Sequence, residues 1–360
     1  MSIKKRTPIS QFNIPVGEYQ SGYYADSYFI RSREILQATL PDVEVIMQVF
    51  QRKEGILCGI DETLALLATC VEHPEKLQVA ALYDGDSISA WETVLTIKGP
   101  LVEFIHFETL YLGFLSRQSK IATNVRKAVK AAQGKPVLFF PSRFDLPSVQ
   151  ESDGFAAFIG GVSSASTPAN NANSGLISSG TIPHALIAAF NGDSVAATQA
   201  FDKVIDPSIN RVALVDFDND CVKTSLEVAR ALGDRLWGVR LDTSDNMVDR
   251  SLWEQMGDFK PTGVCPELIH NVRSALDNEG FSHVKILVSG GFNAERIALF
   301  EKENVPVDAY AVGNSFLDGS MSFTADIFEV NGKLCSKAGR THKPNPRLEP
   351  VNLLELINNK

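Results

Sequence analysis

The chain has 360 residues, of which 44% are hydrophobic and 21% are charged, and its formal net charge is −9. This balance is typical of a globular protein, and the length suits one large α/β barrel with a smaller second domain. The negative charge argues against a general nucleic-acid-binding protein, which would need a basic surface.

Targeting and redox signals are weak. The N-terminal MSIKKRTPISQF has no apolar segment behind it, and no apolar run reaches roughly 18 residues, so we expect neither a signal peptide nor a membrane partner. The cysteines form no C-x-x-C pair; they are Cys58, Cys70, Cys221, Cys265 and Cys335. The wide spacings predict reduced thiols in a cytoplasmic protein and no metal site.

The first part of the chain mixes helices and short strands. Residues 26–40 are expected to form a helix capped by Asp26 or Ser27, and residues 103–132 to form one or two long helices that end before Gly134. Between them, alternating apolar and polar residues predict strands over 43–52 and 88–99. Apolar residues at helical spacing predict a helix over 61–72. We therefore predict an N-terminal α/β domain over residues 1–134.

Beyond residue 134, short apolar segments alternate with helical stretches. The expected strands are Val137–Phe140, Phe155–Gly160, Ile177–Thr181, Val212–Asp216, Trp237–Asp242, Lys285–Ser289 and Ala309–Val312. Strands alternating with helices indicate parallel βαβ units, so a barrel domain over 135–322 is predicted, with an open doubly wound sheet as the alternative. Residues 168–180 are expected to be a loop, and residues 323–360 to pack back on the N-terminal domain.

Polar or glycine residues end several of the expected strands, and in a β/α barrel these ends converge on the active site. Arg240 and Asp242 lie two apart and share a face of their strand, where they suit a sugar phosphate and either ribose hydroxyls or Mg²⁺. The Gly-rich ends of the last two strands suit a phosphate; they are Ser289, Gly290, Gly291, Gly313 and Asn314. A structural ion pair and ordinary turns are the alternatives.

His184 lies in SSGTIPHALI, where proline suits the first turn of a helix. The free N–H groups of such a turn disfavour an imidazolium but suit a neutral imidazole that acquires a phosphate. Asp216, after another strand, could fix its tautomer, or could cap a helix instead. A Ser178–His184–Asp216 triad lacks the nucleophile elbow that such a site requires.

Phe140 and Arg143 follow the first expected strand in VLFFPSRFD. The arginine could neutralise a carboxylate and the phenylalanine could stack on a flat ring, although Phe140 could equally be a core residue. These residues alone predict a barrel enzyme that acts on a sugar phosphate, with an isomerase or an aldolase equally open.

Several motifs together resemble the nicotinate phosphoribosyltransferases, which are type II phosphoribosyltransferases. They are DSYF, FETLYLGFLSRQSKIATNVR, GTIPHALI, LVDFDND, GVRLDTSD, VSGGF and VGNS, in this order. The resemblance implies an irregular, seven-stranded α/β barrel with a smaller N-terminal α/β sandwich domain, to which the C-terminal segment returns. It also implies a homodimer or a higher homo-oligomer with active sites at the subunit interface.

The same resemblance implies ATP-coupled transfer of phosphoribosyl from phosphoribosyl pyrophosphate to nicotinate, with Mg²⁺ as cofactor and only small molecules as substrates. His184 would be phosphorylated and oriented by Asp216, while Asp242 would join them in catalysis. Nicotinate would be bound by Tyr28, Phe140, Arg143 and Thr181, with Tyr28 serving the partner subunit's site. The phosphoribosyl group would be bound by Arg240, Ser289, Gly290, Gly291, Gly313 and Asn314.

The chain departs from the family pattern in two places. Pro141 and Ser142 stand where relatives usually have Gly-Ala, and Cys335 stands alone where some relatives carry a cysteine-rich zinc knuckle. Three alternatives stay open: a quinolinate enzyme, a nicotinamide enzyme, and a catalytically silent nucleotide-binding relative. Quinolinate enzymes typically have Glu-Arg where this chain has Glu108-Thr109, and a Thr-Arg-Lys motif where it has Pro141-Ser142-Arg143.

Overall fold

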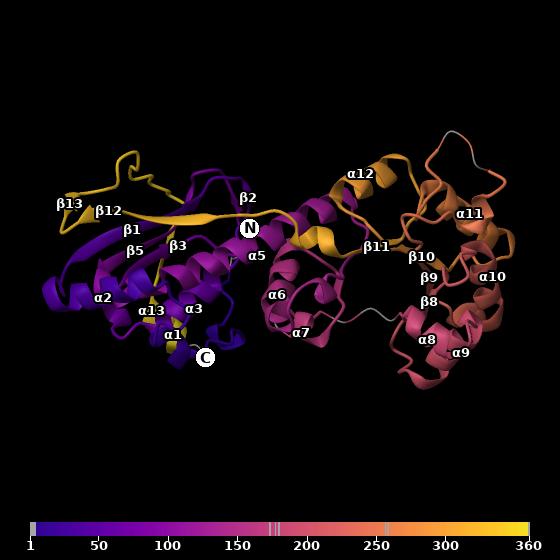
Figure 1. Ribbon diagram of the computed structural model, residues 1–360, viewed down its shortest axis with the longest axis horizontal. Coiled ribbons are helices and arrows are strands. Elements are labelled where there is room, and N and C mark those ends of the chain that lie inside the picture. The colour runs from indigo at the N-terminus through magenta and orange to yellow at the C-terminus, as the bar shows by residue number, and fades with distance from the viewer. Residues whose placement is uncertain are drawn as a thin grey trace. The chain divides into compact units, whose positions relative to one another are not determined.

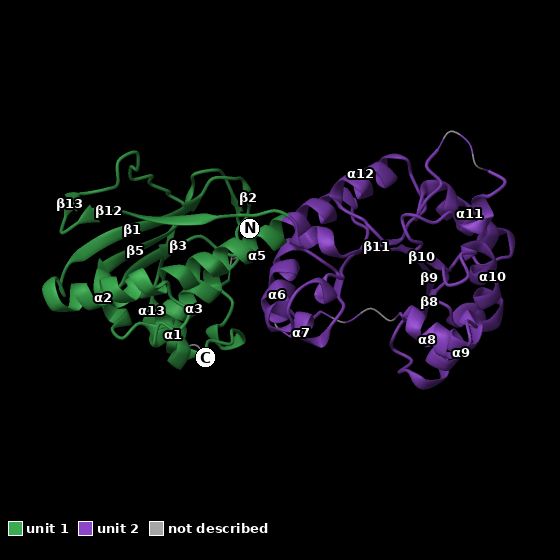
Figure 2. Cartoon of the chain, viewed as in Figure 1, with its two compact units in different colours: residues 1–123, 319–360 green, residues 124–318 purple. Residues whose placement is uncertain are grey.

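The computed structural model describes residues 5–172, 174–176, 178, 181–255, 257 and 259–358. The chain forms two compact units (Figure 2): unit 1 contains Met1–Thr123 and Gly319–Lys360, and unit 2 contains Asn124–Asp318. The C-terminal segment therefore belongs to the same unit as the N-terminal part of the chain.

Unit 1 is built on a six-stranded antiparallel sheet with the order β13-β12-β1-β5-β3-β14 (Figure 1). The strands are β1 (Glu44–Gln51), β3 (Gln78–Ala81), β5 (Thr93–Pro100), β12 (Phe323–Val330), β13 (Lys333–Leu334) and β14 (Glu349–Val351), and β2 (Gly55–Ile56) pairs separately with β4 (Ser87–Ile88). The helices are α1 (Val16–Gln20), α2 (Ser27–Thr39), α3 (Ile60–Cys70), α4 (Leu101–Phe104), α5 (Glu108–Ala131) and α13 (Leu353–Asn358).

The alternating direction of side chains along β1 explains how the sheet of unit 1 buries one of its faces. Val45, Met47 and Val49 of β1 point to one face and are buried with the apolar side of α3 in one core cluster. The C-terminal segment completes the sheet at two places, because β12 pairs with β1 and β14 pairs with β3. The expected strand 88–99 is divided at Trp91, whose φ of 69° is left-handed and interrupts the extended backbone.

Unit 2 contains a curled, six-stranded parallel sheet with the order β7-β6-β11-β10-β9-β8. The strands are β6 (Val137–Phe139), β7 (Ser164–Ala165), β8 (Val212–Leu214), β9 (Gly238–Leu241), β10 (Lys285–Val288) and β11 (Ala309–Val312). The helices are α6 (Gln150–Gly160), α7 (Pro168–Asn171), α8 (His184–Ala189), α9 (Ser194–Val204), α10 (Cys221–Leu232), α11 (Pro266–Asn278) and α12 (Ala294–Lys302).

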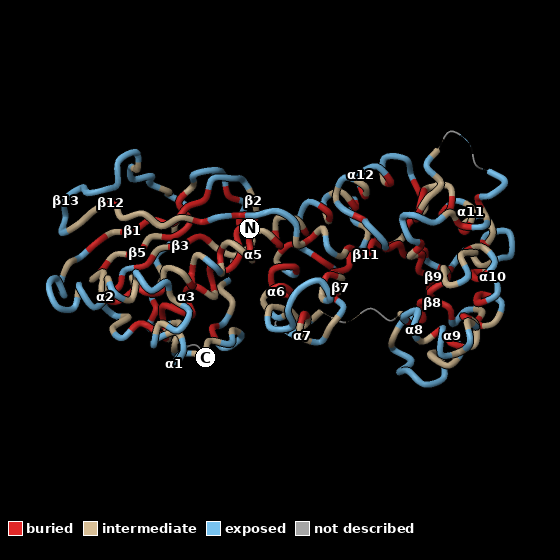
Figure 3. The backbone as a smooth tube through the Cα atoms, in the orientation of Figure 1, coloured by how far each residue is buried: buried red, intermediate tan, exposed pale blue. Residues whose placement is uncertain are grey.

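The expected barrel is confirmed as a curled parallel half-barrel, accompanied by the separate antiparallel-sheet domain. Thr181 forms a parallel bridge to Val212 and so extends the sheet beyond β8. Buried residues follow the central strands of both units (Figure 3), and all of β8, β9 and β11 is buried. Strands covered on both faces read as short apolar runs, which is why they could be found in the sequence.

Two expectations in this region are wrong. Phe155–Gly160 is not a strand but the end of α6, and the strand that follows is β7. A short apolar run does not by itself distinguish a buried strand from a buried helix. Residues 168–171, expected in a loop, form α7, with the Thr167 hydroxyl accepting from the Asn170 N–H. Of the expected strand Ile177–Thr181, Ile177, Ser179 and Gly180 lie outside the described residues.

The cysteines are free, and Cys335 is the exposed one while the others are buried. Within the described parts of the chain, we find no helix with the length and apolar character needed to cross a membrane.

Candidate active site

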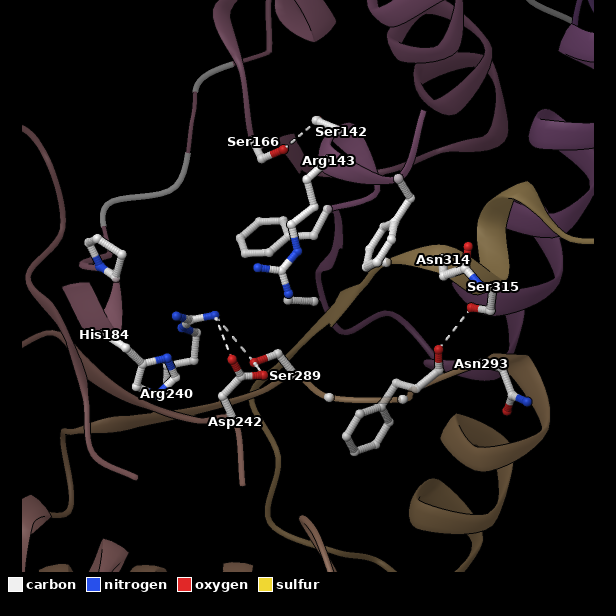
Figure 4. A pocket seen from close by; sticks show the side chains of 18 of the residues that line it. Ser142, Arg143, Ser166, His184, Arg240, Asp242, Ser289, Asn293, Asn314 and Ser315 are labelled. Atoms are coloured by element: carbon white, nitrogen blue, oxygen red, sulfur yellow. Dashed lines mark hydrogen bonds and ion pairs between the residues drawn. The ribbon is translucent and has the colours of Figure 1, made fainter. Parts of the chain in front are cut away.

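A cavity of about 740 Å³ opens at the carboxyl ends of the parallel strands of unit 2 (Figure 4). This is the place where the sequence predicted that polar strand ends would meet. The predicted site residues that line it are Phe140, Arg143, His184, Arg240, Asp242, Ser289, Gly290, Gly291, Gly313 and Asn314.

Arg240 on β9 and Asp242 just after it form a charged cluster with Ser289. The Nη1 atom of Arg240 lies 3.7 Å from Oδ2 of Asp242 and donates to the Ser289 hydroxyl at 3.4 Å. That hydroxyl also lies 2.7 Å from Oδ1 of Asp242. Burial lowers the pKa of Arg240, while Asp242 and Asp216 oppose that shift. The cluster therefore presents a buried cation together with a carboxylate that is partly open to the cavity.

His184 begins α8, as the sequence predicted, and its imidazole contacts Asp216. The Nε2 atom of His184 lies 3.0 Å from Oδ2 of Asp216, and the two side chains are 46% and 7% exposed. Burial raises the pKa of Asp216, although His184 pulls it down. An acceptor at Nε2 fixes the proton of a neutral imidazole on that nitrogen and leaves the Nδ1 lone pair free.

Arg143 and Phe140 line the opposite side of the cavity. Arg143 lies in a short 3-10 helix, Ser142–Phe144, and its exposed guanidinium carbon is 5.4 Å from the centre of the Phe144 ring. Phe140 is partly buried and packs on the small apolar cluster of the sheet, so it both supports the sheet and faces the cavity. Figure 4 shows Arg143 and Arg240 directed into the same space.

The glycines at the strand ends serve two different structural needs. Gly290 and Gly291 have φ angles of 85° and 69°, which residues with a side chain rarely adopt. Gly313 has a negative φ, and a Cβ there would lie 3.1 Å from the Phe144 ring. The first two therefore make the turn into α12, whereas Gly313 makes room for an aromatic side chain.

Three predicted site residues do not line this cavity. Asp216 contacts it only through His184. Thr181 has its hydroxyl buried with no partner in the described chain. Tyr28 belongs to unit 1, where it is 59% exposed on α2 and donates to Asp26 at 3.2 Å.

The cavity also contains residues that sequence reasoning missed. The Ser142 hydroxyl donates to Oδ1 of the buried Asn170 at 2.5 Å and lies 2.7 Å from the Ser166 hydroxyl. Ser166 follows β7, so it was hidden by the wrong assignment of that strand. Asn293, the N-cap of α12, was missed as well, whereas Ser315 lies at the end of the last strand, where the sequence predicted that site residues would meet.

The residues that the structure describes contain no group of three or more His, Cys, Asp or Glu side chains that could hold a metal ion. The carboxylates lining the cavity are Asp242 and Asp318. Mg²⁺ in proteins is often bound by one or two carboxylates together with substrate phosphates. The cavity therefore suits a Mg²⁺ ion that arrives with a polyphosphate.

Two family models match the chain in succession. Residues 26–119 match the description "Quinolinate phosphoribosyl transferase, N-terminal domain", and residues 121–319 match the corresponding C-terminal domain. The second match alone covers more than half of the chain and includes every residue of the cavity.

Solved structures agree with these matches. A nicotinate-nucleotide pyrophosphorylase from Pyrococcus furiosus is 33% identical, with a TM-score of 0.79 over 94% of this chain and 85% of that chain. A human nicotinic acid phosphoribosyltransferase is 18% identical, with a TM-score of 0.68 over 88% of this chain and 77% of that chain, and is similar in fold.

Curated relatives include two nicotinate phosphoribosyltransferases of Mycobacterium tuberculosis. One is 27% identical over 271 residues, which are 73% of this chain and 56% of the relative. The other is 26% identical over 330 residues, which are 86% of this chain and 65% of the relative. The chain thus spans less than two thirds of the length of these relatives.

Proposed function

The chain belongs to the quinolinate phosphoribosyl transferase family of type II phosphoribosyltransferases, and from that premise we propose that it makes nicotinate mononucleotide. The reaction joins nicotinate to the phosphoribosyl group of phosphoribosyl pyrophosphate and is coupled to ATP. The observation that carries this proposal is the His184–Asp216 pair at the cavity. The family resemblance implies that such a phosphate-accepting histidine is present in the ATP-coupled nicotinate enzymes and absent from those that act on quinolinate.

Nicotinate would be bound on the side of the cavity formed by Phe140 and Arg143. Phe140 would stack on the pyridine ring, and the exposed guanidinium of Arg143 would neutralise the carboxylate. Tyr28 would provide the second aromatic contact from a partner subunit. Thr181, whose hydroxyl is buried and which does not line the cavity, would reach the carboxylate only if that hydroxyl became accessible when the ligand binds.

The ribosyl donor would occupy the other side. Arg240 and Ser289 would bind its phosphoryl oxygens, and the glycine loops at Gly290–Gly291 and Gly313–Asn314 would offer backbone N–H groups. Asp242 would hold a Mg²⁺ ion that enters with the diphosphate. That ion would supply charge neutralisation on the departing pyrophosphate.

The chemical step needs orientation more than proton transfer. The pyridine nitrogen attacks C1 of the ribosyl group while the bond from C1 to the pyrophosphate oxygen breaks. Because this nitrogen already carries a lone pair, no general base is required. The enzyme would have to align the two groups and stabilise negative charge on pyrophosphate, and Arg240 would supply that stabilisation.

The coupling step would use the free Nδ1 of His184. This nitrogen would take the γ-phosphoryl group of ATP, so that a P–N bond forms, the P–O bond to ADP breaks and ADP leaves. Asp216 would balance the charge on the ring through the Nε2–H. Water would later cleave the P–N bond, giving inorganic phosphate and the original imidazole.

Quinolinate is the second candidate, favoured by the description of the matching family models and open to the same sugar-phosphate chemistry. It carries one more carboxylate than nicotinate and would need a second cation. Among the described residues that line the cavity, the arginines are Arg143 and Arg240, and Arg240 is already paired with Asp242. One uncommitted arginine suits one carboxylate and favours nicotinate.

We also propose that the protein acts as a homodimer or a higher homo-oligomer and takes only small molecules as substrates, with neither nucleic acid nor membrane as partner. A cytoplasmic location is expected from the free cysteines. Size-exclusion chromatography with light scattering tests the assembly, and a monomer at micromolar concentration would contradict it.

The test of the proposed function offers the purified protein phosphoribosyl pyrophosphate and Mg²⁺ with nicotinate, nicotinamide or quinolinate, each with and without ATP. Mass spectrometry identifies the mononucleotide. We expect product from nicotinate alone, with a higher yield in the presence of ATP. Product from quinolinate with release of CO₂, or from nicotinamide, would replace the proposal with that alternative. Ligand binding with no turnover of any base would favour the catalytically silent relative.

A further inference from the structure

Arg296, in the first turn of α12, donates hydrogen bonds to the Gly290–Gly291 loop from the side that faces away from the cavity. Its Nη1 atom donates to the carbonyl of Gly290 at 2.9 Å and to that of Gly291 at 3.3 Å. Its Nη2 atom donates to the carbonyl of Val264 at 2.6 Å. Its guanidinium carbon lies 4.2 Å from the centre of the Phe292 ring, and burial lowers its pKa. The Phe300 ring lies on it as well, at 5.5 Å, so three carbonyls and two rings hold this cation in place.

These contacts determine which way two peptide groups face. In a planar trans peptide the carbonyl and the following N–H point in opposite directions. Because the carbonyls of Gly290 and Gly291 face Arg296, the N–H groups of Gly291 and Phe292 face away from it. Within the described residues, neither N–H donates to a protein acceptor. Gly290, Gly291 and Phe292 all line the cavity, whereas Arg296 is not part of its lining.

We propose that Arg296 is a positioning residue for a phosphate-binding loop. By holding the two carbonyls back, it keeps the N–H groups of Gly291 and Phe292 available to a phosphate monoester in the cavity. Consecutive N–H groups of this kind form a concave anion site. The identification of that ligand as the ribosyl donor rests on the proposed function, but the orientation of the loop does not.

Two other roles for Arg296 make different predictions. A direct phosphate ligand would need N–H groups directed into the cavity, whereas both terminal nitrogens are used on carbonyls. A purely structural arginine would affect folding stability without changing the affinity for one ligand over another. The positioning role predicts a selective loss of phosphate affinity in a folded protein.

The experiment compares Arg296→Met, Arg296→Lys and a matched control, Arg273→Met. Arg273 on α11 donates in the same manner to the carbonyls of Val284 and Phe281, but it does not line the cavity. Calorimetric titration with ribose 5-phosphate measures phosphate affinity, titration with nicotinate measures the rest of the site, and thermal unfolding reports whether each variant is folded.

We expect Arg296→Met to weaken ribose 5-phosphate binding about tenfold or more while nicotinate binding changes less than about twofold. Arg296→Lys should retain part of the affinity, because an ammonium can still bind one of the carbonyls. Arg273→Met should bind both ligands as the wild type does. Unchanged ribose 5-phosphate affinity in Arg296→Met, or equal losses for both ligands, would overturn the proposal.

Failure of the proposed function would look different. If the wild type binds ribose 5-phosphate and Arg296→Met weakens that binding, the positioning role stands even when no pyridine base is converted. A wild-type protein that does not bind ribose 5-phosphate at all would overturn the positioning role. Should Arg296→Met fail to fold, Arg296→Lys decides the question by the same two titrations.

Discussion

The two sides of the cavity differ in how their charges are arranged. On one side, which we call the paired wall, Arg240 contacts Asp242 and Ser289, and His184 contacts Asp216. On the other side, which we call the open wall, Arg143 has no carboxylate partner in the described chain. The residues that line this wall with it are Phe140, Ser142 and Ser166. The charged groups of the paired wall are therefore partnered within the protein, whereas the guanidinium of Arg143 on the open wall is available to an anion.

This difference has a physical cause. A buried cation costs free energy unless it is paired, so Arg240 requires Asp242. Arg143 is exposed to solvent on a short 3-10 helix and can remain unpaired at little cost. Substitutions on the paired wall should consequently disturb both charge balance and chemistry, and substitutions on the open wall should disturb binding of one substrate.

The largest effect is expected from Arg240→Met, which would remove the cation of the paired wall and leave Asp242 without it. We expect kcat/KM for the ribosyl donor to fall by about 1000-fold or more, because the departing pyrophosphate loses its main protein cation. Steady-state kinetics measure this. Arg240→Lys should recover part of the loss. If kcat/KM of Arg240→Met falls by less than about tenfold, Arg240 does not bind the donor.

His184→Ala should separate the two proposed reactions, ATP hydrolysis and phosphoribosyl transfer. We expect substrate-stimulated ATP hydrolysis to fall about 100-fold or more while some transfer to nicotinate continues without ATP. Phosphate release and mononucleotide formation are measured in parallel. His270→Ala, an exposed histidine of α11, is the control and should keep both activities. If His184→Ala still hydrolyses ATP in a nicotinate-stimulated manner, the phosphohistidine role is wrong.

On the open wall, Arg143→Ala should raise KM for nicotinate about tenfold or more and change KM for the ribosyl donor less than about twofold. The reason is that the cation would contact only the base. Initial rates with each substrate varied in turn give both constants. The KM of Arg143→Lys for nicotinate should lie between those of the wild type and Arg143→Ala, since an ammonium replaces the charge but not the planar guanidinium. Equal increases in both KM values would exclude the carboxylate contact.

The smallest change is expected in the stability of Asp216→Asn. Burial raises the pKa of Asp216, so the folded protein binds this proton more tightly than the unfolded chain does. The stability that this gives is present below the ordinary pKa of 3.8 and is lost as pH rises through the folded pKa. At neutral pH the buried charge is a cost, partly offset by His184.

At pH 7 the free energy of unfolding of Asp216→Asn should therefore lie within about 1 kcal/mol of the wild-type value or exceed it. The variant should nevertheless lose ATP coupling. Chemical denaturation at pH 7 and at lower pH measures the difference, which should shrink toward acid. A marked loss of stability at neutral pH would show that the pair with His184 contributes more than burial of the carboxylate costs.

Much of this arrangement could be predicted from the sequence. Strands β8 to β11 are short apolar runs whose ends located expected site residues. Asp242, Ser289 and Gly313 follow β9, β10 and β11 at once, and Asp216 lies two residues after the end of β8. The Pro183–His184 pair likewise predicted where α8 begins. Local chemistry was sufficient in these cases because each signal lies within a few residues of the element it marks.

Other features depend on contacts between distant segments. The Phe155–Gly160 run is the end of α6, a helix whose Gly154 packs tightly on the Asn170 backbone, where a Cβ would lie 2.0 Å from the carbonyl oxygen. No local pattern shows that contact, and with β7 misplaced, Ser166 was missed. Arg296 was missed for a similar reason, since its partners at Val264 and Gly290 lie in separate loops.

The proposed function couples ATP hydrolysis to transfer of phosphoribosyl to nicotinate in the cavity. The most direct test measures, in one time course with the wild-type protein, the ratio of ATP hydrolysed to nicotinate mononucleotide formed. We predict that ATP hydrolysis depends on both substrates and approaches one ATP per nicotinate mononucleotide, with hydrolysis and synthesis rising together. Nicotinate mononucleotide formed at full rate with no ATP consumed, or ATP hydrolysis indifferent to both substrates, would contradict it.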